Sequence, residues 1–91
     1  MMRKDESMES IGERIRHKRN EHGFDVCHYA VALLVTPETI HKIENDEFPD
    51  LPRHWLTRIA ALNGLETKEL VKDTNIHFYD PSRQVYVLRK E

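Results

Sequence analysis

Two helix-start signals lie close together in the stretch 24–45, FDVCHYAVALLVTPETIHKIEN, and they constrain the fold more than any other feature. Asp25 is suited to cap a first helix, because its carboxylate can accept from the free N–H groups of the first turn. Thr36 can cap a second helix, with Pro37 at the first helical position, where the missing N–H costs nothing. Two such short helices with so brief a corner must cross steeply. The stretch therefore predicts a helix-turn-helix.

Apolar residues at helical spacing support both helices. Tyr29, Ala30 and Leu33 fall at i, i+1 and i+4 and form one apolar stripe. Ile40 and Ile43 share a face of the second helix at i, i+3. One face of each helix is thus expected to be buried, and the remaining positions of the second helix are expected to point outward.

The same stretch resembles the helix-turn-helix of the phage-repressor and Cro-like DNA-binding family. The family pattern runs from an apolar residue and a cap, through Leu-Ala and a Leu-Gly-Val corner, to Ser or Thr and then Ile-x-x-Ile-Glu-Asn-Gly. The matching segments of this chain are Phe24-Asp25, Tyr29-Ala30, Leu33-Leu34-Val35, Thr36 and Ile40–Asp46. The similarity covers roughly residues 11–71, and it implies a repressor-like domain built from short helices.

A helix that precedes this stretch carries an arginine on its apolar face. Ile11 and Ile15 lie at i, i+4, and Arg19 continues the same face. Burial of an unpaired charge is costly. In the repressor-like family an arginine at this position pairs with the glutamate of Ile-Glu-Asn. The resemblance therefore implies a largely buried ion pair between Arg19 and Glu44, as a feature of the fold and not of a binding site.

Two more helices are expected after the helix-turn-helix. Residues 46–52 are expected to form a loop, because they include two prolines. Residues 53–63 carry an apolar side that includes Trp55, and they predict a fourth helix. Residues 66–71 predict a short fifth helix, which matches the closing element of the family.

The C-terminal part of the chain has a different residue pattern from the helical part. Residues 76–79 and 84–88 are β-prone, and the turn-forming segment 80–83 lies between them, so a β-hairpin is expected. A lone hairpin is not stable in water, so this one must pack on the helices or pair with another copy. A homodimer through the hairpin or the Trp55 region is expected.

The sequence thus predicts an all-α, five-helix repressor-like helix-turn-helix domain with a C-terminal β-hairpin. Residues 1–10 are expected to be a disordered lead, with Ser10 as the cap of the first helix. The helix-turn-helix domain is expected to span residues 11–73, and the hairpin residues 74–91.

Length and composition set outer limits on this interpretation. The chain has 91 residues, which is enough for one small domain. It has no apolar run near the ~18 residues that a membrane span needs and no signal peptide, so a cytoplasmic location is expected. One cysteine excludes an internal disulfide. The net charge of −2 is unusual for a DNA binder, although a basic face can coexist with an acidic back.

The second helix of a helix-turn-helix lies in the major groove, and its N-terminal residues reach base edges. Lys42 could donate to guanine, Glu38 could accept from cytosine, and Thr39 could meet a thymine methyl group. The expected base-reading residues are Pro37, Glu38, Thr39, His41 and Lys42. The expected phosphate contacts are Thr36, Asn45, Arg53 and His54. The partner they imply is double-stranded DNA, bound by a homodimeric transcriptional regulator of bacterial or phage type.

The alternative is a protein-interaction adaptor on a helix-turn-helix fold that has lost DNA binding. Val26 stands where the family often has a phosphate-gripping glutamine, and Asp46 and Glu47 make the loop after the second helix acidic. These departures favour a protein partner. Nothing in the sequence resembles a nucleophile with its base, so no enzyme is expected. The histidine and cysteine spacings match no zinc site, so neither a metal nor another cofactor is expected.

Overall fold

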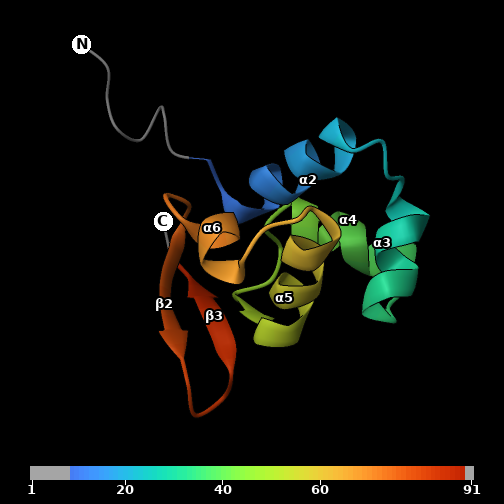
Figure 1. The fold of residues 1–91 in the computed structure, drawn as a ribbon. Helices are drawn as coiled ribbons and strands as arrows, with labels where there is room; N and C mark the ends of the chain where they lie inside the picture. Colours follow the sequence, from blue (N-terminus) through green and yellow to red (C-terminus); the bar gives the residue numbers. More distant parts are fainter. Residues whose placement is uncertain (1–8, 90–91) are drawn as a thin grey trace.

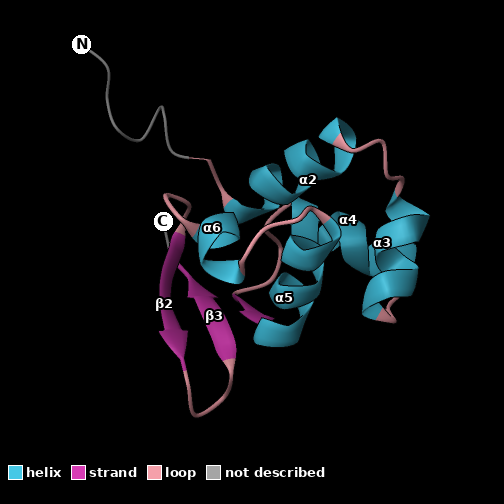
Figure 2. Ribbon diagram, viewed as in Figure 1, coloured by secondary structure: helices cyan, strands magenta, loops and turns pink. Residues whose placement is uncertain are grey.

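The computed structural model describes residues 9–89, and within them the chain forms five helices and three strands (Figures 1 and 2). The elements are α2 (Ile11–Glu21), α3 (Val26–Leu33), α4 (Pro37–Glu44), β1 (Asp50–Pro52), α5 (Arg53–Leu62), α6 (Thr67–Val71), β2 (Ile76–Asp80) and β3 (Val85–Leu88). The helices gather around one core, and the sheet lies at the opposite side of the molecule from α3 (Figure 1).

The expected helix caps are present. The Ser10 hydroxyl accepts from Glu13 N–H at 3.0 Å, and the Glu13 carboxylate accepts in turn from Ser10 N–H, which closes a capping box at the start of α2. The Asp25 carboxylate accepts from His28 N–H at 2.9 Å at the start of α3. These bonds satisfy N–H groups that the first turn of a helix leaves free, so each helix begins at its capping residue.

Ser10 and the residue before it make defined contacts, although both fall in the segment expected to be a disordered lead. Glu9 forms a bridge with Thr74, and its carboxylate contacts Arg14 and His17. The remainder of that expected lead, residues 1–8, lies outside the described residues, as do residues 90–91 at the end of the expected hairpin.

One apolar core joins the helices to the inner face of the sheet. Each helix contributes the side that its spacing predicts, and β1 and β3 each add a leucine. Because the members come from distant parts of the chain, the core ties the sheet to the helical domain. The buried apolar residues are Ile11, Ile15, Tyr29, Ala30, Leu33, Ile40, Ile43, Leu51, Leu56, Ile59, Ala60, Leu70 and Leu88.

The sheet corrects the all-α prediction. The C-terminal hairpin forms as β2 and β3, but a third strand, β1, lies within the segment 46–52 that was expected to be a loop. The strand order is β1-β3-β2, and β1 pairs antiparallel with β3 through Leu51 opposite Tyr86 and Pro52 opposite Val85. The architecture is therefore mixed: five helices with a small three-stranded antiparallel sheet.

A proline is tolerated in β1 for a physical reason. Proline has no N–H to donate to a ladder, so it is confined to edge strands and strand ends. Pro52 is the last residue of β1, and β1 lies at an edge of the sheet. Strand β3 is central, because it pairs with β1 on one side and with β2 on the other. The hairpin thus packs on its own chain.

Candidate nucleic-acid interface

Local hydrogen bonds fix the N-terminus of α4, the expected recognition helix. The Thr36 hydroxyl accepts from Thr39 N–H at 3.2 Å and lies 3.0 Å from the Thr39 hydroxyl. Pro37 occupies the first turn, where its ring sets a helical φ in advance. The start of α4 is thus held by its own sequence.

The two faces of α4 differ sharply. Ile40, Ile43 and Glu44 are buried, and Glu44 is only 3% exposed. The outward face carries four of the five expected base-reading residues, all exposed: Pro37, Glu38, His41 and Lys42. The fifth residue, Thr39, is half-buried and its hydroxyl already contacts Thr36. The outward face of α4 can therefore offer a donor at Lys42, an acceptor at Glu38 and an imidazole at His41.

An ion pair beneath α4 fixes its tilt on α2. The Arg19 guanidinium donates from Nε to Glu44 Oε2 at 2.7 Å and from Nη2 to Glu44 Oε1 at 3.0 Å. It also donates to the carbonyl of Phe24 at 3.2 Å. The hydrogen bond to the Glu44 carboxylate is the main reason that the pKa of Arg19 is raised above its usual value. The two side chains are 12% and 3% exposed, so the expected, largely buried ion pair is present.

A close backbone contact that sequence reasoning missed lies beside this pair. A Cβ at Gly12 would lie 2.4 Å from the backbone oxygen of Glu44, so only glycine lets α2 approach α4 so closely. Gly12 N–H also donates to the Asp46 carboxylate at 2.9 Å. Asp46 has φ of 58°, a left-handed conformation that aspartate adopts more readily than most residues.

The corner between α3 and α4 contains a strained residue. Leu34 has φ of 61°, a left-handed conformation that leucine rarely adopts. The N–H groups of Leu34 and Val35 donate back to Val31 and Ala30, at 3.2 and 3.0 Å, and close the end of α3. Arg58 of α5 adds a hydrogen bond to the Ala32 carbonyl at 3.1 Å. The family pattern has glycine where Leu34 stands, and this departure is the sequence signal from which the strain could have been predicted.

Two solved structures share the arrangement of these helices. A chain of the SinR protein/SinI protein complex matches with a TM-score of 0.63 at 22% identity, over 69% of this chain and 61% of that one. A chain from the crystal structure of the master regulator for biofilm formation SinR in complex with DNA matches with a TM-score of 0.61 at 22% identity, over 68% of this chain and 98% of that one. This chain has the repressor-like helix-turn-helix fold. No protein-family model and no curated protein matches the sequence.

The residues that are expected to contact phosphate lie at three helix ends. Thr36 is exposed at the start of α4, and Asn45 is exposed at its C-terminal end. Arg53 and His54 are exposed in the first turn of α5. Arg53 N–H donates to the Gln84 carbonyl at 2.9 Å, so the turn between β2 and β3 holds this helix end in place. Their roles toward phosphate remain predictions.

The expected departures from the repressor-like pattern are also in place. Asp46 and the exposed Glu47 lie in the segment that follows α4, so two carboxylates come after this helix. Cys27 is exposed in the first turn of α3.

Within residues 9–89 no group of three or more metal-ligating side chains is arranged to hold an ion. None of the helices in this part of the chain is long and apolar enough to cross a membrane.

Proposed function

We propose that this protein binds double-stranded DNA as a homodimeric transcriptional regulator of bacterial or phage type, with α4 as the helix that enters the major groove. The observation that carries the proposal is the division of α4 into a buried apolar face and an exposed face. The outward side chains of Glu38, His41 and Lys42 include donors and acceptors that match base edges. In support, a structural neighbour with the same fold was solved in complex with DNA.

The homodimer is part of the same proposal. Two copies related by a two-fold axis would place their α4 helices about one turn of B-DNA apart, on a pseudo-palindromic site. Two surfaces are candidates for the contact. Strand β2 lies at the edge of the sheet opposite β1, and this edge could pair with that of a second copy. Trp55 is half-buried and packs near Phe48, with ring centroids 5.7 Å apart.

The test is an anisotropy titration of labelled, randomised duplex DNA at low salt. We expect binding to weaken in Lys42→Ala and in Arg53→Ala, while Lys68→Ala, an exposed change on α6, behaves as wild type. Binding should also weaken steeply with added salt, because phosphate neutralisation releases counterions. No binding at micromolar protein in low salt would exclude the regulator. Equal losses in Lys42→Ala and Lys68→Ala would exclude α4 as the reading helix.

A protein-interaction adaptor is the second candidate, and the acidic loop after α4 favours it. Asp46 and Glu47 would repel a DNA backbone placed beside them. A structural neighbour was solved in a complex with the protein SinI, so a chain with this fold can occur together with a protein partner. An adaptor would show no binding to DNA at low salt. Substitutions in α4 would change its affinity for the partner protein only if α4 forms part of the contact.

A further inference from the structure

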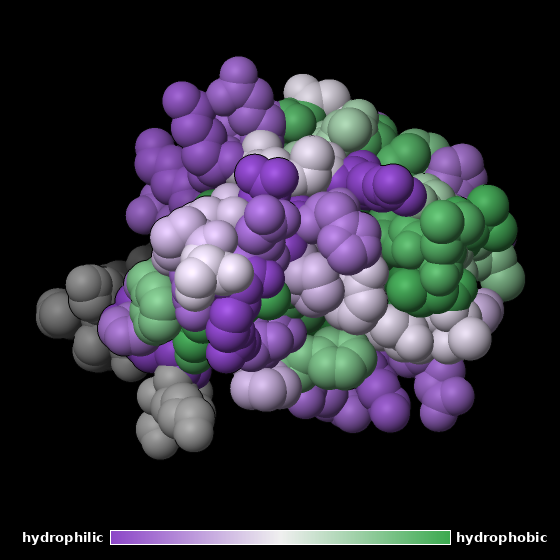
Figure 3. Space-filling view, turned by 90° about the horizontal axis from the view of Figure 1, so that it is seen from below, coloured by the Kyte–Doolittle hydropathy of each residue, from purple (hydrophilic) through white to green (hydrophobic). Residues whose placement is uncertain are grey.

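Two large apolar side chains, one on α3 and one directly after it, project into solvent. Val31 is 74% exposed and Leu34 is 81% exposed, although both follow directly on buried core residues. Cys27 and Val31 lie at i, i+4 on one outward face of α3, and Leu34 is the left-handed residue that directly follows this helix. We call Val31 and Leu34 the apolar knob. Figure 3 shows an apolar cluster on the side of the molecule where Figure 1 places α3.

The apolar knob is costly for an isolated domain. An exposed leucine gains nothing from burial, and the left-handed backbone of Leu34 adds strain that an ordinary conformation avoids. Backbone strain of this kind is a reason to look for a function. Arg58 lies beside the knob, because its guanidinium bonds the Ala32 carbonyl between Val31 and Leu34 in sequence.

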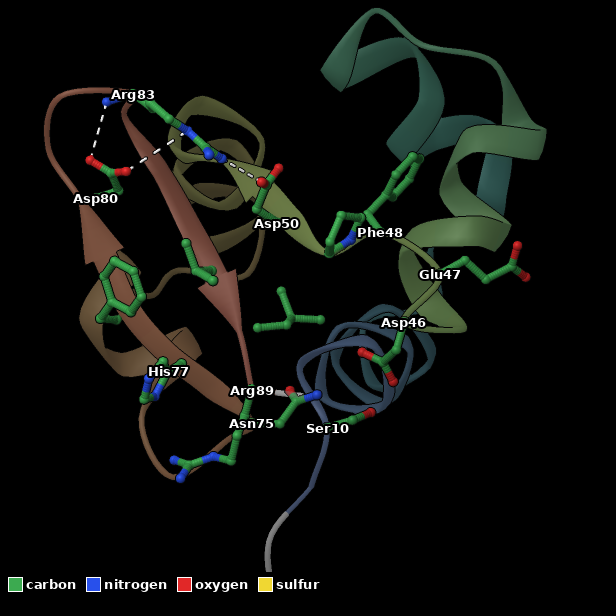
Figure 4. A pocket seen from close by; sticks show the side chains of 14 residues that line it. Ser10, Asp46, Glu47, Phe48, Asp50, Asn75, His77, Asp80, Arg83 and Arg89 are labelled. Atoms are coloured by element: carbon green, nitrogen blue, oxygen red, sulfur yellow. Dashed lines mark hydrogen bonds and ion pairs between the residues drawn. The ribbon is translucent and has the colours of Figure 1, made fainter. Parts of the chain in front are cut away.

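A concave surface of matching character lies on the sheet. A groove of about 960 Å³ opens between strands β2 and β3 and the segment that follows α4 (Figure 4). We call it the sheet groove. Phe78, which is 49% exposed, lines it and is the third large exposed apolar side chain within residues 9–89. Phe48 and Val87 add further apolar lining.

The charges that line the sheet groove are mainly acidic. Its acids are Asp46, Glu47, Asp50 and Asp80. The cations that line it are Arg83 and Arg89. Arg83 pairs with the carboxylates of Asp50 at 2.5 Å and Asp80 at 3.8 Å, and the four acids against two arginines leave a formal excess of two negative charges. An apolar surface that carries a cation, as the apolar knob does at Arg58, is therefore complementary to this groove in both polarity and charge.

The apolar knob and the sheet groove cannot meet within one molecule. Helix α3 lies at one end of the fold, and β2 and β3 lie at the other (Figure 1). We propose that the occupant of the sheet groove is the apolar knob of a second copy of this chain. The contact joins two different surfaces head to tail, so each added copy leaves one knob and one groove open, and the assembly can grow. It is distinct from a two-fold dimer, in which both copies use the same surface.

The test uses one blocking substitution on each surface. Leu34→Asp places a carboxylate in the apolar knob beside Val31, and aspartate adopts the left-handed conformation more readily than leucine, so the corner is preserved. Phe78→Asp places a carboxylate in the groove. Asn20→Asp, an exposed change on α2 outside both surfaces, is the matched control. Wild type and each variant are immobilised in turn and tested in solution against all of these proteins, themselves included, without DNA. A reductant is present, because Cys27 lies beside the knob and a disulfide would imitate association. Thermal melts establish that each variant is folded.

We expect each blocking variant to bind itself at least about tenfold more weakly than wild type binds itself, because a carboxylate in an apolar contact must be desolvated. The mixed pair of Leu34→Asp with Phe78→Asp should bind, since one copy keeps its groove and the other its knob. The mixed pair retains one intact contact between a knob and a groove, whereas the self-pairs of the two blocking variants retain none. Equal binding in all pairings would show a two-fold dimer only and would overturn the proposal. Absence of wild-type association at millimolar protein would also overturn it. Both results are independent of DNA binding.

Discussion

Arg19 and Glu44 form a two-point ion pair that joins α2 to the last turn of α4. Both oxygens of a carboxylate that is only 3% exposed are bonded to the same guanidinium. The pair leaves neither charge stranded in the core, and it sets the angle at which α4 presents its outward face.

Arg19→Met should therefore lower the free energy of unfolding by about 3–5 kcal/mol, because the Glu44 carboxylate is left buried and unpaired. Urea denaturation followed by circular dichroism measures the change. The double variant with Glu44→Leu should regain much of the loss, since replacement of a buried pair by apolar residues is often neutral. If the double variant is as unstable as Arg19→Met, the stranded charge is not the cause.

Gly12→Ala should lower the free energy of unfolding by about 1–3 kcal/mol, because the new Cβ has to push α2 away from the backbone of α4. Lys18→Ala on the same helix is the control, and we expect it to stay within about 0.5 kcal/mol of wild type. Equal stability of the two variants would show that α2 can shift at little cost.

Leu34→Gly should raise the free energy of unfolding by up to about 1 kcal/mol, because glycine adopts the left-handed conformation without a Cβ penalty. Leu34→Ala also needs positive φ, so it should give no such gain. Thermal melts of the two variants, compared with wild type, decide the matter. A lower melting temperature for Leu34→Gly than for Leu34→Ala would contradict strain at the corner.

The contacts of Glu9 should make the free energy of unfolding depend on pH in the acidic range. The pKa of the Glu9 carboxyl lies below its ordinary value of 4.5, chiefly because Arg14 donates a hydrogen bond to it, while burial partly opposes this effect. A carboxyl with a lowered pKa stabilises the fold above its ordinary pKa, and that contribution is lost as the pH falls through the folded value.

Between about pH 6 and pH 3, wild type should therefore lose more stability than Glu9→Gln, which has no such carboxyl to protonate. Denaturant midpoints across this range give the comparison. Parallel curves for the two proteins would show that Glu9 contributes nothing in its ionised form.

Sequence reasoning succeeded where the determinants are local. Asp25 and Thr36 cap the helices that follow them, because a side chain three residues away from an N–H group is placed by the helix itself. The apolar faces of α3 and α4 follow from helical spacing in the same way. The likeness in fold to the two solved structures confirms the repressor-like expectation.

Features that depend on distant parts of the chain were missed. Leu51 pairs with Tyr86, and no local pattern around β1 announces a partner so far along the chain. The proline beside Leu51 instead suggested a loop. The need for glycine at position 12 arises only when α2 meets α4. The roles of Lys42 and the other outward residues of α4 remain predictions, because only a bound ligand shows which side chains a surface uses for recognition.

The pairing of β1 with β3 also sets an order of folding. Helices α2 to α4 can form through contacts close in sequence, whereas β1 meets β3 only after the intervening chain has been drawn together, at an entropic cost that rises with loop length. The sheet should therefore be completed late. Until then Leu51 is not covered by β3, and the segment that follows α4 is open to a protease. A nascent chain would acquire its helix-turn-helix before it acquires protection there.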